Sequence, residues 1–213
     1  MLKNMISGDT FDRAKKAAAE KLSQVQDLGG EFVGGRTEAI RQALRIGGVK
    51  VFKLRETAHM PTYGTEWASC FDLRSSIQQG DVIRYFTQSN VDGKHYVQDD
   101  GKFTLMPGWR ALIPTGLIFD LDENQTVRVH PRSGLAIKSG ITLANCEGVI
   151  DADYVEECFI TVFNVSDQPY KIEDGMRLAQ GEVIESAPIK FNIVTERPAR
   201  KTDRVGGFGS TGV

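Results

Sequence analysis

From Val49 onward, short hydrophobic runs of the kind found in β-strands recur along the chain. Turn-forming residues separate them, as at 107–108 and 174–175, and Pro114 interrupts one run. No helix-length segment lies between successive runs, as a parallel sheet would require. We therefore predict a mainly β fold, a jelly-roll-like barrel or sandwich. The clearest runs are residues 49–54, 111–119, 159–163 and 178–184.

Residues 1–48 follow a different pattern. Hydrophobic residues recur at helical spacing from Phe11 to Val25, and a second short helix fits residues 37–46. These alanine-rich segments contain no chemical motif, so we expect a helical extension that serves packing or assembly. The predicted organisation is an N-terminal helical extension (1–48), a β domain (49–198) and a mobile C-terminal arm (199–213).

Residues 77–106 are predicted to form a long hairpin or flap. Hydrophobic runs at 82–86 and 95–97 flank an Asp92-Gly93 pair, which is typical of a tight turn. A further turn is expected at 99–101.

Composition narrows the possible partners and location. The 26 basic and 28 acidic residues nearly cancel, which argues against nucleic acid as the main partner. No hydrophobic run approaches the length of a membrane span, so we expect a soluble, cytoplasmic protein without a membrane partner. The cysteines are odd in number and form no C-x-x-C pair, so they suggest neither a disulfide framework nor a zinc site, and we expect them to be small buried residues. The histidines are not spaced as metal ligands. These residues are Cys70, Cys146 and Cys158, and His59, His95 and His130.

Five segments place polar or glycine residues where a strand does not need them. Arg132 and Ser133 lie at a predicted turn and can donate to an anion. Asp151 directly follows an apolar Gly-Val-Ile run, and burial of an unsatisfied carboxylate is costly. The five segments are residues 68–73, 131–136, 145–154, 177–180 and 204–212.

The fifth segment, Arg-Val-Gly-Gly-Phe-Gly-Ser-Thr-Gly, is a glycine-rich phosphate loop that ends at Gly212. Its glycines let backbone N–H groups crowd an anion, and Phe208 offers a flat face for a base. A nucleotide P-loop needs a strand before it and a helix after it, so this segment is not of that type. A disordered Gly/Ser tail is the alternative interpretation.

Taken in order, the five segments resemble the five motifs of the homotrimeric dUTP pyrophosphatases (dUTPases). Pro-Arg-Ser-Gly-Leu-Ala at 131–136 and Gly-Val-Ile-Asp-Ala-Asp-Tyr at 148–154 are nearly verbatim. The likeness covers residues 49–76 and 105–213, and it leaves 1–48 and 77–104 unmatched. It implies hydrolysis of dUTP to dUMP and pyrophosphate, a homotrimer with shared active sites, and Mg²⁺ as cofactor.

The resemblance also implies residue roles. Asp151 would be the general base that positions water at the α-phosphorus, and Gln180 would help to hold that water or an α-phosphate oxygen. Mg²⁺ would ride on the triphosphate, with Asp72 reaching it through water. The implied phosphate-binding residues are Arg132, Ser133, Gly134, Gln180, Arg204, Gly209, Ser210 and Thr211, and the implied nucleoside-binding residues are Asn145, Gly148, Val149, Ile150, Asp151, Tyr154 and Phe208.

In this reading Asn145 and the backbone at Gly148 read the uracil edge, Tyr154 lies against the deoxyribose, and Phe208 stacks on the base. Two motifs depart from the family pattern, besides the unmatched insert at 77–104. Arg204 lies four residues before Phe208 instead of five, and Val155-Glu156 replaces the usual pair ending in glycine.

Two other functions are compatible with this pattern. The dCTP deaminases resemble dUTPases in fold, but Thr161 occupies the position of their catalytic glutamate, and Glu156 and Glu157 come too early. A regulatory protein of the same fold could instead bind a protein partner through 77–104 or 1–48.

Overall fold

The computed structural model describes residues 48–186 and 189–203. The helices predicted within 1–48 and the glycine-rich end of the arm lie outside these ranges. In the described part, no helix is long and apolar enough to cross a membrane.

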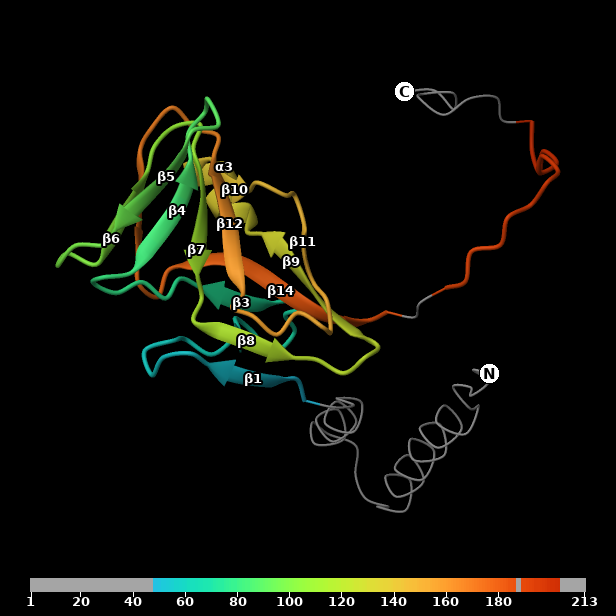
Figure 1. The fold of residues 1–213 in the computed structure, drawn as a ribbon, viewed down its shortest axis with the longest axis horizontal. Helices are drawn as coiled ribbons and strands as arrows, with labels where there is room; N and C mark the ends of the chain where they lie inside the picture. The colour runs from blue at the N-terminus through green and yellow to red at the C-terminus, as the bar shows by residue number, and fades with distance from the viewer. Residues whose placement is uncertain (1–47, 187–188, 204–213) are drawn as a thin grey trace, which may run out of the picture.

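Two five-stranded antiparallel sheets form the body of the molecule (Figure 1). In the first sheet strand β7 (Arg110–Pro114) lies at the centre, and the hairpin from the 77–104 insert forms one edge. Its strands, in spatial order, are β10 (Ile141–Leu143), β12 (Phe159–Asn164), β7 (Arg110–Pro114), β4 (Val82–Phe86) and β5 (Asp92–Tyr96).

The second sheet carries most of the polar segments. Its strands, in spatial order, are β11 (Gly148–Ile150), β9 (Gln125–Pro131), β14 (Arg177–Glu185), β3 (Phe71–Arg74) and β2 (Thr62–Tyr63). Two smaller pairs and one short helix complete the fold: β1 (Lys50–Lys53) with β8 (Leu117–Asp120), β13 (Tyr170–Glu173) with β6 (Lys102–Leu105), and α3 (Ser133–Ser139). The predicted mainly β, jelly-roll-like fold is confirmed.

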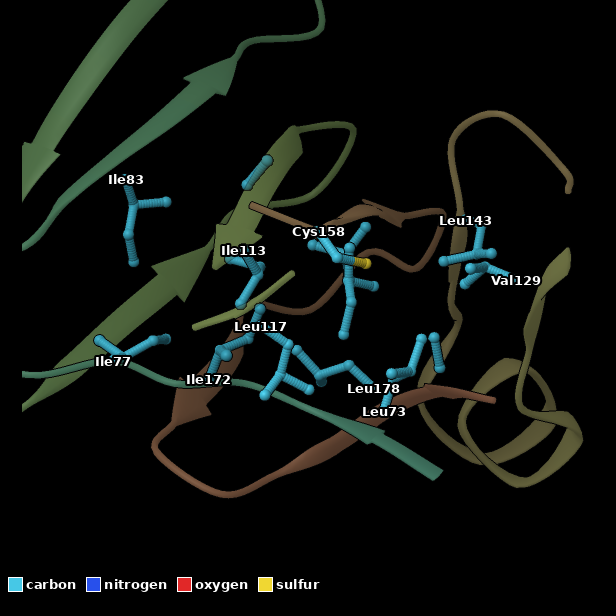
Figure 2. Packing of buried hydrophobic residues seen from close by; sticks show 14 of the residues in the cluster. Leu73, Ile77, Ile83, Ile113, Leu117, Val129, Leu143, Cys158, Ile172 and Leu178 are labelled. Atoms are coloured by element: carbon cyan, nitrogen blue, oxygen red, sulfur yellow. The ribbon is translucent and has the colours of Figure 1, made fainter. Parts of the chain in front are cut away.

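Hydrophobic side chains that alternate along the strands form one core. Leu73, Ile113 and Leu178 are among its members, and each is at most 2% exposed. Figure 2 shows Cys158 among these aliphatic side chains, with Val129 and Leu143 at one side of the cluster. Burial on this scale, at about 25 cal/mol per Å² of apolar surface, is the main stabilising contribution.

The predicted hairpin exists, but its turn lies elsewhere. Asp92 and Gly93 belong to strand β5, so the turn expected there is wrong. The chain reverses at residues 87–91, where the Thr87 N–H donates to the Val91 carbonyl (3.0 Å) and Asn90 has φ 60°. Strand β4 pairs with β7, which makes the hairpin part of a main sheet and not a separate flap.

Candidate active site

A cavity of about 320 Å³ lies beside strand β11. It brings together five of the residues predicted to bind a nucleoside, which come from the β10–β11 turn, from β11 and from the segment after it. These are Asn145, Gly148, Val149, Ile150 and Tyr154; Leu112, Val129, Leu143, Cys158, Phe159 and Thr161 complete the lining.

Local backbone geometry keeps this cavity open. A Cβ atom on Gly148 would lie 3.1 Å from Cβ of Val129 and would narrow the floor. Asn145 lies in a tight turn in which the Glu147 N–H donates to the Asn145 carbonyl (2.6 Å), while Cys146 adopts φ 58°. The side-chain amide of Asn145 remains for a ligand, since no hydrogen bond occupies it within the described residues.

Tyr154 forms a fixed wall. Its hydroxyl donates to the Glu157 carbonyl (2.9 Å), and its N–H donates to the Asp151 carbonyl (3.1 Å). Desolvation and the neighbouring Cys158 and carboxylates raise the pKa of Tyr154, so the hydroxyl stays protonated. Behind it, burial raises the pKa of the Cys158 thiol to about 12, and this cysteine serves as an uncharged wall of the cavity.

Asp151 directly follows β11 and is exposed in the single chain. The apolar run before it therefore does not bury its carboxylate. It borders a wider hollow of about 670 Å³ together with Glu123, Arg128 and Asp153. Val149 lines both this hollow and the 320 Å³ cavity beside β11, which we call the nucleoside cavity. Asp151 therefore lies next to the nucleoside cavity.

A second group of predicted site residues gathers around Asp72 on β3. Its carboxylate is 12% exposed; Oδ1 lies 3.2 Å from Nε of Arg132, and Oδ2 lies 3.2 Å from Nη1 of Arg177. Arg132 also donates to the Arg177 carbonyl (3.0 Å). Gln180 pairs with Asp72 across the strands and donates to the Pro131 carbonyl (3.2 Å). This cluster of two guanidinium groups and one amide is suited to a phosphate chain.

Ser133 and Gly134 lie at the start of helix α3 and are exposed. The sequence predicted a turn at this point, and the structure corrects it to a helix that begins after Arg132. Arg132 has an extended conformation (φ −94°, ψ 123°) and forms no side-chain cap. Its guanidinium group is therefore directed to Asp72 and not to the helix end.

Asp151 and Arg132 lie at opposite ends of strand β9, while Gly148 pairs with Val129 between them. Ile150 pairs with Val127, while Arg132 follows the other end of the strand. Residues 127 to 132 span roughly 17 Å of extended chain, and Asp151 lies one step further out. In addition, Arg132 reaches toward β3, whereas β11 lies on the other side of β9. One chain thus does not bring Asp151 to Arg132 and Gln180.

Two features of the described residues were not predicted. Arg177 was noted as a polar strand end without a role, yet its pairing with Asp72 places it in the same cluster as Arg132. Cys146 is exposed and Cys70 is half-buried, so only Cys158 fits the prediction of buried cysteines. No local signal in the sequence marks Arg177, because Asp72 becomes its neighbour only when β14 pairs with β3.

The remaining site predictions concern the arm. Arg204, Phe208, Gly209, Ser210 and Thr211 all lie outside the described residues. The geometry does address the deaminase alternative. Glu157 accepts a hydrogen bond from the Gly116 N–H (2.7 Å), and Thr161 lines the cavity where that class of enzyme requires a glutamate.

Comparison with known proteins agrees with this geometry. The family model described as dUTPase matches residues 96–212. A deoxyuridine 5'-triphosphate nucleotidohydrolase of Rhizobium etli is 41% identical over 160 residues, covering 74% of this chain and 88% of the relative. A protein of the same name from Rhizobium rhizogenes is 37% identical over 155 residues, covering 72% and 85%.

Solved structures show the same fold. The dUTPase of Staphylococcus bacteriophage 80alpha with dUPNHPP superposes with a TM-score of 0.60 at 21% identity, covering 78% of this chain and 99% of that one. A dUTPase from Streptococcus mutans gives 0.52 at 22% identity, covering 68% and 100%. The family model and the two curated relatives establish that the chain belongs to the dUTPase family.

Proposed function

We propose that this protein hydrolyses dUTP to dUMP and pyrophosphate through attack of water on the α-phosphorus, with Asp151 as the base. The observation that carries the proposal is the cavity beside β11, in which Asn145, Gly148 and Tyr154 surround a space of nucleoside size next to Asp151. Membership of the dUTPase family identifies the nucleoside as deoxyuridine. The reaction removes dUTP and supplies dUMP.

Asp151 acts mainly by placement. An aspartate with an ordinary pKa near 4 is a weak base, so its benefit comes from holding water in line with the α-phosphorus. Its exposure in the single chain leaves the carboxylate open to water and to substrate. Gln180 fixes the other side of the same water or an α-phosphate oxygen.

The Asp72 cluster holds the phosphate chain. Arg132 donates to the phosphate oxygens and stabilises the charge that develops on them during attack. Ser133 and Gly134 add donors from the exposed start of α3, and Asp72 keeps the Arg132 guanidinium in place. In the arm, Arg204, Gly209, Ser210 and Thr211 close over the phosphates, while Phe208 stacks on the uracil.

Mg²⁺ fits this donor set only as an ion carried by the substrate. The described residues hold no cluster of three metal-ligating side chains. Mg²⁺ keeps much of its water shell and is commonly bound by one or two carboxylates plus substrate phosphates. The two arginines leave about half of the lone-pair sites of Asp72 free for metal-bound water. When bound, the ion neutralises charge on the triphosphate.

Selection of the base and sugar follows from the cavity walls. Asn145 and the Gly148 backbone hydrogen-bond to the uracil edge, and a donor–acceptor pattern set for uracil rejects the amino group of cytosine. The Tyr154 ring, held by its bond to Glu157, leaves no space for a 2′-hydroxyl group.

A complete site requires more than one chain. Asp151 must reach the α-phosphorus through a single water, whereas Arg132, which holds the same phosphates, lies roughly 17 Å or more away along β9. A homotrimer solves this, because Asp151 of one protomer then faces the Asp72 cluster of another. We expect the active enzyme to be this homotrimer, and we expect it to act in the cytoplasm.

Replacement of Asp151 tests the proposal. Asp151→Asn keeps the shape of the side chain but removes the base, so pyrophosphate release from dUTP should fall by about 10²–10⁴-fold. Binding of a non-hydrolysable dUTP analogue, measured by calorimetry, should change little. Near-normal turnover in this variant, or a wild-type protein that releases ammonia from dCTP, would contradict the proposed function.

A further inference from the structure

A second cavity, of about 370 Å³, lies between the insert and the neighbouring part of the β domain, and it shares no lining residue with the nucleoside cavity. Its walls come from β4, β5, β6 and β13 and from the segment that leads into β7. Figure 1 shows β4, β5 and β6 grouped on one side of the molecule, away from β9 and β11. We refer to it as the hairpin cavity. Its volume is close to that of the nucleoside cavity and falls in the range of small-molecule sites.

Aromatic rings form one wall of the hairpin cavity. The rings of Tyr85 and Trp109 stack with their centroids 4.5 Å apart and an interplanar angle of 2°. Phe103 lies 6.2 Å from Tyr85, and His95 lies 5.3 Å from Phe103, measured between ring centroids. Tyr85 covers one face of Trp109, and the other face of Trp109 is suited to a flat aromatic ligand, because every nucleic-acid base can stack favourably on an aromatic ring.

The position of Tyr85 depends on a glycine opposite it. Gly93 is the cross-strand partner of Tyr85, and a Cβ atom there would lie 2.4 Å from the ring. The glycine lets the ring lie over the β5 backbone and meet Trp109. The aromatic wall is therefore a built feature of the insert and not a chance contact of surface side chains.

Lysines line the other side of the cavity. Lys94, Lys102 and Lys171 contribute positive charge, against one acid in the lining, Asp100. Lys102 is paired with Glu173 at 2.8 Å. Lys94 and Lys171 are exposed and have no ion-pair partner within residues 48–186 and 189–203. A lysine ammonium is a common point-charge donor to phosphate.

We propose that the hairpin cavity binds a nucleotide, that is, an aromatic base carrying phosphate groups, separately from the site of dUTP hydrolysis. The base stacks on the face of Trp109 that Tyr85 does not cover, and Lys94 and Lys171 bind the phosphates. This binding is a second function, at a cavity built from the 77–104 insert together with Trp109 and Lys171 of the β domain.

Calorimetric titration of the full chain with ATP tests the proposal, with the hydrolytic site first filled by Mg²⁺ and one equivalent per protomer of a non-hydrolysable dUTP analogue, so that no excess analogue competes for the hairpin cavity. ATP should bind, and adenosine and inorganic triphosphate should each bind more weakly because each supplies half of the contacts. The double variant Lys94→Gln/Lys171→Gln should bind ATP at least about tenfold more weakly. Its hydrolysis of dUTP should be unchanged.

A matched control distinguishes the loss of lysines in the cavity from a general loss of positive charge. Lys50→Gln/Lys190→Gln removes the same charge at exposed positions outside the cavity and should bind ATP as the wild type does. The proposal is overturned if millimolar ATP gives no binding, if both double variants bind equally, or if inorganic triphosphate binds as tightly as ATP. None of these results depends on whether dUTP is hydrolysed.

Discussion

Cys146 is a residue in a left-handed backbone conformation, with φ 58°, at the turn that presents Asn145 to the nucleoside cavity. For a residue with a Cβ atom this conformation costs roughly 1–2 kcal/mol. The surrounding turn holds it, since the Cys146 N–H donates to Leu143 (3.4 Å) and the Glu147 N–H donates to Asn145 (2.6 Å). Backbone strain is thus located beside Asn145, the residue that we propose reads the base.

Cys146→Gly should stabilise the protein by about 0.5–1 kcal/mol. Glycine adopts this conformation without strain, and its larger loss of chain entropy on folding offsets only part of that gain. Urea unfolding at a fixed protein concentration measures the change. Asn90→Gly is the matched control: Asn90 has φ 60° but tolerates it, and its side chain accepts a hydrogen bond from Arg110. A gain at Asn90 that equals or exceeds the gain at Cys146 would contradict the strain assignment.

Single residues were predictable where their chemistry is local. Asn145, Gly148 and Tyr154 were expected to serve one nucleoside, and one cavity does bring them together. The role of Arg177 was not predictable, because its partner Asp72 is 105 residues away in sequence and becomes its neighbour only when β14 pairs with β3.

At the scale of elements, the hairpin β4–β5 shows how a correct signal can be misinterpreted. An Asp-Gly pair between two hydrophobic runs favours a tight turn. Here Gly93 is needed for another reason, since only a residue without Cβ allows the Tyr85 ring to cross β5. The strands themselves were predictable from alternation, whereas the turn position depends on a cross-strand contact that the local pattern does not contain.

Gly93→Ala should therefore destabilise the hairpin. The new methyl group would meet the Tyr85 ring at 2.4 Å and force it away from Trp109, at an expected cost of about 1–3 kcal/mol. Urea unfolding of variant and wild type gives the difference. Gly48→Ala, which meets no atom within 4 Å, should stay within about 0.5 kcal/mol of wild type. Equal effects at the two positions would show that Gly93 has no special role.

At the scale of the whole molecule, strand β9 separates two half-sites. The nucleoside cavity and Asp151 lie toward one end, beside β11, and the Asp72 cluster lies at the other, across β14. The order of the motifs in the sequence does not show this separation, although the resemblance to dUTPases implied active sites shared between chains. The register of β9 with β11 and β14 reveals the separation.

The shared site is tested most directly by complementation between two inactive variants. Asp151→Asn and Arg132→Ala should each abolish most dUTP hydrolysis when present alone. In trimers formed from an equal mixture of both variants, about a quarter of the sites would combine an intact Asp151 with an intact Arg132 from different protomers. Pyrophosphate release from dUTP should then recover to about a quarter of the wild-type rate. Activity no greater than the sum of the separate variants would contradict a site built between chains.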